Sequence, residues 1–213
     1  MKLEESTQYL RGFGAIEKEC FNVYDTVSKK INHPESSLVL GMAYDSLKCS
    51  KIMQAILDCF EQANTENLKT KKDLTDLATQ LSTFSQEIQR INCLNYQSSC
   101  EVLKELTKLE KFLTDAYSSY AHSTATNAIA QEVTKYSNAN VENFAKVFEK
   151  IAEEKERHRE ELVEIIFALE QTEANRLRQI TPVVKYQNPD AWIRGSTIQT
   201  FSTNLTAAAN SIE

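Results

Sequence analysis

The sequence predicts an all-α protein: an antiparallel four-helix bundle with a long, partly helical crossover between its second and third helices, and an irregular C-terminal tail. Three observations support this. Apolar residues recur every three to four positions through most of the chain, which is the period of a helix that buries one face. Only 4 Gly and 3 Pro occur in 213 residues, and two of the three Pro follow Ile180. Residues that favour helices dominate the remainder.

The first two helices are separated at His33-Pro34. An apolar stripe begins near Tyr9, after a polar segment at residues 1–8 that we expect to be frayed. The second helix is expected to begin near Pro34, because proline suits the first turn of a helix, and to run to about Asn64. Such a short connection makes the two helices antiparallel neighbours.

The crossover, at about residues 65–97, is polar, but its apolar residues keep helical spacing over Lys72 to Asn92. A third helix is expected from about Ser99 to Thr126. After a polar stretch, a fourth is expected from near Val141 to Leu177, with last turns that are polar and project from the bundle. The bundle therefore occupies residues 1–178.

Residues 179–213 have a different composition. Pro182, Pro189, Gly195 and many Ser, Thr and Asn predict an irregular tail. The tail holds the only Trp, Trp192, among apolar neighbours. We expect this segment to dock on its own bundle, on a symmetry mate or on a separate protein partner, and we expect the chain to form a homo-oligomer, a dimer or larger.

Charge and hydropathy exclude several classes of protein. A net charge of -6 and a pI near 5.3 argue against a nucleic-acid binder, because phosphate recognition needs a basic face. The best basic run, Lys69 to Lys72, is short and is followed by Asp73 and Asp76. No run of 18 apolar residues and no apolar leader occur, so we expect a cytoplasmic protein without a transmembrane segment.

The five cysteines form no CxxC pair and are odd in number. This pattern predicts buried, reduced thiols, or at most one local bridge, between Cys93 and Cys100.

Two candidate carboxylates lie at equivalent places in the first and third helices. Glu17 is followed seven residues later by Tyr24, and Glu110 is followed seven residues later by Tyr117. Seven residues turn a helix by about 700°, close to two full turns, so each Glu lies on the same side of its helix as the Tyr that follows it.

The second and fourth helices also resemble each other. The run MAYDSLKC of the second helix aligns without a gap on IAEEKERH of the fourth. This alignment places Asp45 on Glu154 and Cys49 on His158, so that in each helix an acid precedes a potential ligand by four residues and shares its side. The chain therefore reads as two copies of a helix pair.

A bundle that directs one carboxylate from each of two helices, and an acid with a second ligand from each of the other two, has the layout of a di-metal carboxylate site. Carboxylates with imidazole suit iron or manganese, and open positions on such a pair allow oxidase, peroxidase or ferroxidase chemistry. The candidate ligands are Glu17, Asp45, Cys49, Glu110, Glu154 and His158, with Tyr24, Tyr117 and Lys155 beside them. We expect Glu17, Glu110, Glu154 and His158 to converge in the bundle interior.

The two halves resemble those of the ferritin-like superfamily, which includes ferritins, bacterioferritins and rubrerythrins. The runs LVLGMAYDSLKCSKIMQAI and FEKIAEEKERHREELVEII are similar to the second and fourth helices of rubrerythrin-like proteins, and the resemblance covers Tyr9 to about Leu169. It implies a ferritin-like bundle in which Glu17 and Glu110 are the lone metal-binding glutamates, with Glu19 as the alternative to Glu17 in the first helix.

The chain departs from the family motif Glu-x-x-His. Ser46 and Lys155 stand where the two motif glutamates belong, and Cys49 stands where the first His belongs. If Lys155 points inward, its ammonium replaces the metal as the internal tie of the bundle. An alternative function is therefore a metal-free bundle that acts as a structural or protein-interaction module. A second alternative, an unrelated membrane-binding helical dimer, needs a basic concave face, and the net negative charge counts against it.

Overall fold

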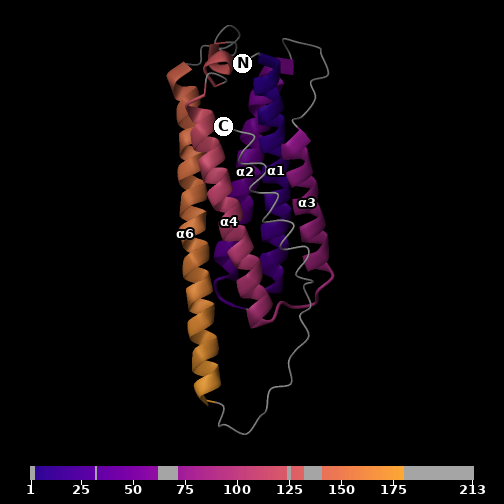
Figure 1. Ribbon diagram of the computed structural model, residues 1–213, viewed down its shortest axis with the longest axis vertical. Helices are drawn as coiled ribbons and strands as arrows, with labels where there is room; N and C mark the ends of the chain where they lie inside the picture. The colour runs from indigo at the N-terminus through magenta and orange to yellow at the C-terminus, as the bar shows by residue number, and fades with distance from the viewer. Residues whose placement is uncertain (1–2, 32, 62–71, 124–125, 132–140, 180–213) are drawn as a thin grey trace.

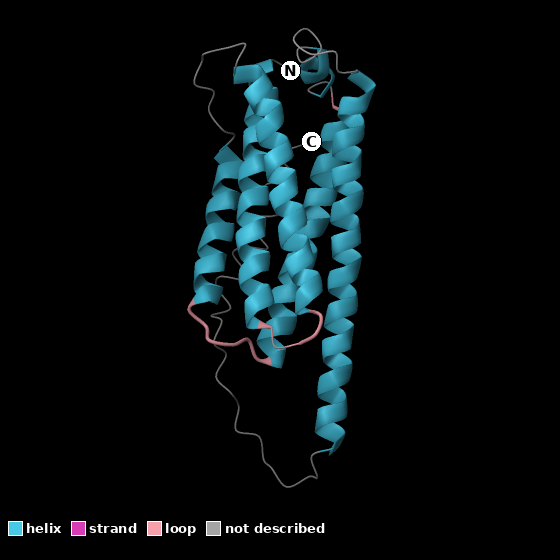
Figure 2. Cartoon of the chain, turned by 180° about the vertical axis from the view of Figure 1, so that it is seen from behind, coloured by secondary structure: helices cyan, strands magenta, loops and turns pink. Residues whose placement is uncertain are grey.

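The computed structural model describes residues 3–31, 33–61, 72–123, 126–131 and 141–179 of the chain. These residues form helices joined by turns, with no strand among them (Figure 2), as the all-α prediction requires. In chain order the helices are α1 (Leu3–Lys30), α2 (Ser36–Glu61), α3 (Lys72–Gln89), α4 (Tyr96–Ala121) and α6 (Val141–Gln179). Residues 126–131 are also helical.

The bundle consists of two helix pairs that lie side by side (Figure 1). In each pair, α1 with α2 and α4 with α6, the backbones pack closely along their length. The two pairs approach each other most closely where α2 meets α6, and elsewhere large side chains fill the space between them. This wider space between the pairs is where the candidate site lies.

The direction of each helix follows from the connections. Helix α3 returns along the outside of the bundle, so α4 begins at the same end as α2 and runs parallel to it (Figure 1). At that end the backbone N–H of Leu94 donates to the carbonyl of Lys30 at 3.1 Å. Helix α4 then starts at Asn95, whose side chain accepts from the N–H of Ser98 at 2.8 Å and caps the helix.

Helix α3 confirms the crossover helix that the apolar spacing predicted, and it packs on α1 as a fifth helix. The contact is close at Gly12, because a Cβ there would lie 2.7 Å from Cβ of Leu74 and 2.4 Å from its Cδ1. Only glycine allows α3 to approach α1 at this point. The buried face of α3 is formed by Leu74, Leu77, Ala78, Leu81, Phe84, Ser85 and Ile88.

Other expectations need correction. The predicted frayed segment at residues 1–8 is helical from Leu3, because a helix end needs no apolar face to form its backbone hydrogen bonds. Leu38, the first residue of the run LVLGMAYDSLKCSKIMQAI in the second helix, is 47% exposed despite its apolar side chain. The predicted tail at 179–213 lies, but for Gln179, outside the described residues, and so does Trp192. None of the described helices combines the length and apolar character needed to cross a membrane.

Candidate functional site

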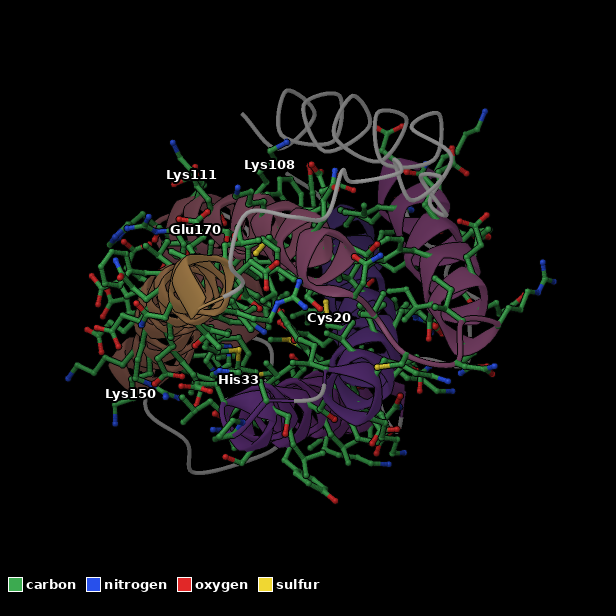
Figure 3. The ribbon with its side chains drawn as sticks, turned by 90° about the horizontal axis from the view of Figure 1, so that it is seen from below. Cys20, His33, Lys108, Lys111, Lys150 and Glu170 are labelled. Atoms are coloured by element: carbon green, nitrogen blue, oxygen red, sulfur yellow. The ribbon has the colours of Figure 1, made fainter. Side chains whose placement is uncertain are left out.

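The space between the two helix pairs holds a cluster of polar side chains without contact with solvent. In a view along the helices, Cys20 lies in the interior of the bundle, and Lys108, Lys111 and Lys150 lie at its outer edge (Figure 3). The cluster draws on all four helices of the bundle. Its members, each 0% exposed, are Glu17 and Tyr24 from α1, Ser46 from α2, Glu110 and Tyr117 from α4, and Lys155 and His158 from α6.

The two buried glutamates each accept a hydrogen bond from a tyrosine of the other helix pair. Tyr117 of α4 donates its hydroxyl to Oε1 of Glu17 at 3.0 Å. Tyr24 of α1 donates to Oε1 of Glu110. The sequence placed each Tyr on the same side as the Glu of its own helix, but the hydrogen bonds are exchanged between α1 and α4. Each bond therefore ties one helix pair to the other.

Lys155 lies at the centre of the cluster, rather than beside it as the sequence suggested. Its Nζ is 2.8 Å from Oε2 of Glu17 and 3.9 Å from Oε2 of Glu110. It also donates to the hydroxyl of Ser46 at 3.1 Å. Lys155 therefore points inward and forms an ion pair with a buried carboxylate of the other helix pair. One ammonium thus faces two buried carboxylates.

The pKa shifts follow from this arrangement. Burial lowers the pKa of Lys155, but attraction to Glu110 and Glu17 more than offsets burial and holds this pKa well above its usual value, so Lys155 is charged. Burial raises the pKa of Glu17, and Lys155 only partly opposes the rise. Burial also raises the pKa of Glu110, but Lys155, His158 and Tyr24 together hold this pKa below its usual value. Although Lys155 lies closer to Glu17, the larger set of partners favours the ionised form of Glu110.

The two tyrosines are held in their phenol form. Burial raises the pKa of both Tyr24 and Tyr117 well above the usual value, and the adjacent carboxylates raise it further. Both side chains therefore act as hydrogen-bond donors across the physiological pH range. Phe13 packs on Tyr117, with ring centroids 4.6 Å apart, and closes this side of the cluster with an apolar wall.

His158 connects the cluster to the surface. Its Nε2 is 3.1 Å from Oδ2 of Asp45, an α2 side chain that is 29% exposed, and its Nδ1 is 3.7 Å from Oε1 of Glu110. Among the residues that the structure describes, neither Nδ1 of His158 nor Oε2 of Glu110 has a hydrogen-bond partner. Burial raises the pKa of Asp45, but hydrogen bonds from His158 and Lys48 bring it below the usual value.

Glu154 does not join the buried cluster, contrary to expectation. Its side chain is 18% exposed and lies at the rim between α2 and α6, where Oε1 accepts from Lys48 at 2.5 Å. The thiol of Cys49 donates to its other oxygen at 3.6 Å. Of the four residues expected to converge, Glu17, Glu110 and His158 do so. Asp45 also lies at the rim, where Arg157 donates to it at 3.0 Å.

The contacts at the rim repeat the exchange seen in the centre. In the gapless alignment, Lys48 corresponds to Arg157 and Asp45 to Glu154. Lys48 binds Glu154, and Arg157 binds Asp45. The remaining aligned pairs behave alike: the Cys49 thiol meets Glu154 as the His158 ring meets Asp45, and Ser46 meets its own counterpart, Lys155. The two halves thus contact each other through an approximate internal two-fold relation.

The residues present do not fit a pair of metal ions. A di-metal site needs several carboxylate and imidazole groups directed at the same cations, but Lys155 directs an ammonium at both buried glutamates. Asp45 and Glu154 are held by basic side chains at the rim. Within the described part of the chain, no group of three or more His, Cys, Asp or Glu side chains is placed to hold a metal ion. Metal binding stays a prediction that metal analysis has to test.

The cysteines are free thiols in the described residues. Cys20 and Cys49 are buried beside the cluster, and burial raises the pKa of both. Cys93 and Cys100 form no bridge, so the reduced alternative is the correct one for this pair. Cys93 is exposed, contrary to the expectation that the thiols are buried.

Three residues that form contacts in the cluster or at its rim were not among the predicted ligands: Ser46, Lys48 and Arg157. The signal for them was present in the sequence, because the alignment of the second and fourth helices pairs Lys48 with Arg157 and Ser46 with Lys155. Like-placed residues of a two-fold repeat tend to meet at its axis or to exchange partners across it. Comparison of the chain with models of protein families, with curated proteins and with solved structures gave no match.

Proposed function

We propose that this chain is a ferritin-like helical bundle whose centre is closed by Lys155 in place of metal ions, and that it serves as a structural or protein-interaction module. The observation that carries the proposal is the position of the Lys155 ammonium, 2.8 Å from Glu17 and 3.9 Å from Glu110. A cation fixed to the chain neutralises part of the carboxylate charge without any bound ion.

The course of the chain supports the ferritin-like part of the proposal. Two antiparallel helix pairs are joined by one long crossover, which makes α2 and α4 parallel (Figure 1). A bundle with one such crossover is a known alternative to the simple up-and-down arrangement, and ferritin-like folds have it. The exchanged contacts between the halves agree with a duplicated helix pair. Helix α3 is an addition within the crossover.

The chemistry of the centre supports the metal-independent part. A divalent ion bound to both Glu17 and Glu110 would meet the Lys155 ammonium within a few ångströms, and the repulsion of like charges in a buried site is large. The rim acids Glu154 and Asp45 do not supply the missing metal ligands, because Glu154 is bound to Lys48 and Asp45 to Arg157. Binding two ions would require Lys155 to leave and both rim acids to turn inward.

A di-iron or di-manganese enzyme is the second candidate. The observation that favours it is the convergence of Glu17, Glu110 and His158, all without contact with solvent, next to two tyrosines. Together with the buried Cys49, this set is what remains of the predicted ligands once the rim acids Asp45 and Glu154 are removed.

Elemental analysis separates the two candidates. The protein is purified without chelator and measured before and after anaerobic loading with iron or manganese. The module predicts no stoichiometric metal in either sample. About two ions per chain, as a di-metal site holds, lost in a Glu110→Ala variant, would establish the enzyme.

A Lys155→Glu variant is the positive control, because it replaces the ammonium by a carboxylate next to Glu17, Glu110 and His158. We expect this variant to take up metal, and a matched Lys104→Glu variant at an exposed position of α4 to take up none. Circular dichroism verifies that each variant is helical. Metal uptake by the unmodified chain equal to that of Lys155→Glu would contradict the proposal.

A further inference from the structure

One side of helix α4 is buried although it points away from the centre of the bundle. Glu110 faces the buried cluster, and Phe112, two residues later, lies about 160° round the helix from it. Phe112 is nevertheless only 6% exposed, whereas Phe167 of α6 is 61% exposed. The buried residues that share this side of α4 lie within an arc of about 60°. We call them the α4 face: Glu105, Leu109, Phe112 and Ala116.

The described helices leave this face without a close neighbour. Among them, only α6 has a backbone that packs closely on α4. It approaches from the side of Glu110, since Lys155 of α6 lies 3.9 Å from Oε2 of Glu110. Helix α1 meets the same inner half of α4, where Phe13 packs on Tyr117, and α3 packs on α1. A further segment is therefore needed to explain why Phe112 is buried.

Glu105 indicates the chemistry of that segment. Its side chain is 7% exposed, and its Oε1 accepts from Lys108 at 2.7 Å. Among the residues that the structure describes, Oε2 of Glu105 has no hydrogen-bond partner. A buried carboxylate oxygen is unfavourable without a donor, and an acidic neighbour would repel it. The α4 face therefore suits a segment that is apolar on one side, uncharged and rich in hydrogen-bond donors.

The C-terminal residues 196–212 have this composition. None of these 17 residues is charged, and ten of them carry a hydroxyl or an amide group. The large apolar residues fall within an arc of about 60° if the segment is helical, and we call them its apolar stripe: Ile198, Phe201, Leu205 and Ile212. The stripe matches the apolar residues of the α4 face, and the remaining residues supply donors.

The chain between α6 and this segment is long enough to reach the α4 face. Lys104 of α4 pairs with Glu170 of α6 at 3.5 Å, so Glu105 lies at about the level of Glu170. Helix α6 ends at Gln179, nine residues or about 13.5 Å further along. Residues 180–195 span up to about 50 Å when extended. This reach allows the segment that follows to run beside α4.

Two other stretches outside the described ranges, residues 62–71 and 132–140, are less suitable. They connect helices at the end of the bundle opposite to the start of α4 (Figure 1). Each is tied to a described helix on both sides, and each contains at least two charged residues. Neither therefore combines the reach and the neutral composition that the α4 face requires.

We propose that residues 196–212 dock on the α4 face of their own chain, with the apolar stripe toward Phe112. The inference goes beyond the proposed function, because it concerns the outer side of α4 and depends neither on Lys155 nor on metal. Docking removes the apolar side chains of both partners from water. It also brings hydroxyl and amide groups to Oε2 of Glu105.

Thiol labelling of the full chain tests whether the α4 face is covered. In a Cys93→Ser background, a maleimide should label Phe112→Cys at least about tenfold more slowly than Lys111→Cys, because a covered thiol reacts only when its cover opens. Lys111→Cys is the matched control, since Lys111 is exposed on the same helix. Mass spectrometry follows the labelling, and circular dichroism verifies that each variant is helical.

Changes within the segment identify the cover. Addition of Phe201→Asp and Leu205→Asp to the Phe112→Cys chain should bring its labelling rate close to that of the exposed control. Addition of Thr200→Asp and Thr203→Asp places the same charges on the side of the helical wheel opposite to the apolar stripe, and should leave the thiol protected.

Four outcomes would overturn the proposal. In the first, Phe112→Cys is labelled as fast as the control while the segment is unmodified, so the α4 face is open. In the second, protection withstands the two changes in the apolar stripe, and in the third, the threonine pair removes protection equally. In the fourth, protection falls when the protein is diluted, which identifies a second copy of the chain as the cover.

Discussion

The two halves of the chain make the same contacts at the rim of the bundle and different ones at its centre. At the rim, Lys48 of the first half binds Glu154, as Arg157 of the second half binds Asp45. At the centre, the tyrosines are exchanged in the same way, but the position held by Lys155 in the second half is held by Ser46 in the first. The two halves therefore share their backbone arrangement, but only the second half contributes a buried positive charge. The neutralisation of the buried glutamates depends on Lys155 alone, whereas each half contributes one ion pair of the same kind at the surface.

Replacing Lys155 should have the largest effect. Lys155→Met keeps a long side chain but leaves Glu17 and Glu110 buried without their cation. We expect a loss of about 3–5 kcal/mol in the free energy of unfolding at pH 7, as found when one partner of a buried ion pair is removed. Guanidinium denaturation followed by circular dichroism measures it.

Lys104→Met is the control for this variant, because Lys104 forms an exposed pair with Glu170 at 3.5 Å. Its loss should stay below about 1 kcal/mol. If the two variants lose the same free energy, the central charge is no more important than a surface pair.

The two tyrosines should differ in importance despite their equivalent places. Tyr24→Phe removes the hydroxyl donor of Glu110, whose Oε2 is 3.9 Å from the ammonium of Lys155, and we expect a loss of about 1.5–3 kcal/mol, typical of a hydrogen bond to a charged group. Tyr117→Phe should cost less, because Glu17 keeps Lys155 at 2.8 Å. Urea unfolding of both variants at pH 7 gives the order, and equal losses would mean that Lys155 serves both glutamates alike.

The buried glutamates should also give opposite dependences of stability on pH. The pKa of Glu110 lies below its ordinary value of 4.5, so the stability it contributes is complete above pH 4.5 and is lost as the pH falls through the lower, folded-state pKa. The pKa of Glu17 lies above 4.5, so its contribution is complete below pH 4.5 and is lost as the pH rises through the folded-state pKa.

Urea unfolding between pH 3 and pH 7 tests these two signs. The difference between the unmodified chain and Glu110→Gln should shrink toward acid, and the difference from Glu17→Gln should shrink toward neutral pH. One unit of pKa shift corresponds to about 1.4 kcal/mol. If the stability difference changes with pH in the same direction for both variants, the pKa values of Glu17 and Glu110 are not shifted in opposite directions.

The smallest effects are expected at the rim. Lys48→Met and Arg157→Met each remove a cation that is 51% exposed, and each should cost about 0.2–1 kcal/mol in urea unfolding. The loss should fall in 1 M salt, which screens exposed pairs. Two similar losses would support the equivalence of the two halves at the surface. A markedly larger loss for Arg157→Met would mean that the halves differ at the rim as well as at the centre.

The helices were predictable where one apolar stripe dominates. The limits of α3 agree with the prediction at its first residue, Lys72, because its polar and apolar faces are distinct. The start of α1 at Leu3 was missed, because its first residues carry no apolar stripe. In α2 the apolar residues surround the helix, so spacing alone did not indicate that Leu38 faces outward.

The candidate site was predictable within a helix but not between helices. Spacing placed Glu17 with Tyr24 and Glu110 with Tyr117 on common faces, and all four are buried in the cluster. The exchange of partners depends on how the two pairs dock, which no spacing within one helix encodes. The direction of Lys155 also depends on its environment, because a lysine on an amphipathic helix is more often solvated than buried.

The hydrogen bonds that Tyr24, Tyr117 and Lys155 donate at the centre all run from one helix pair to the other. If the α4–α6 pair slid by one helical turn, about 5.4 Å, Lys155 would lose Glu17 and both tyrosines would lose their acceptors, while leucines would still meet leucines. Apolar packing alone tolerates such a shift; unpaired buried charges do not. The polar centre therefore distinguishes the correct register of the two pairs from its neighbours.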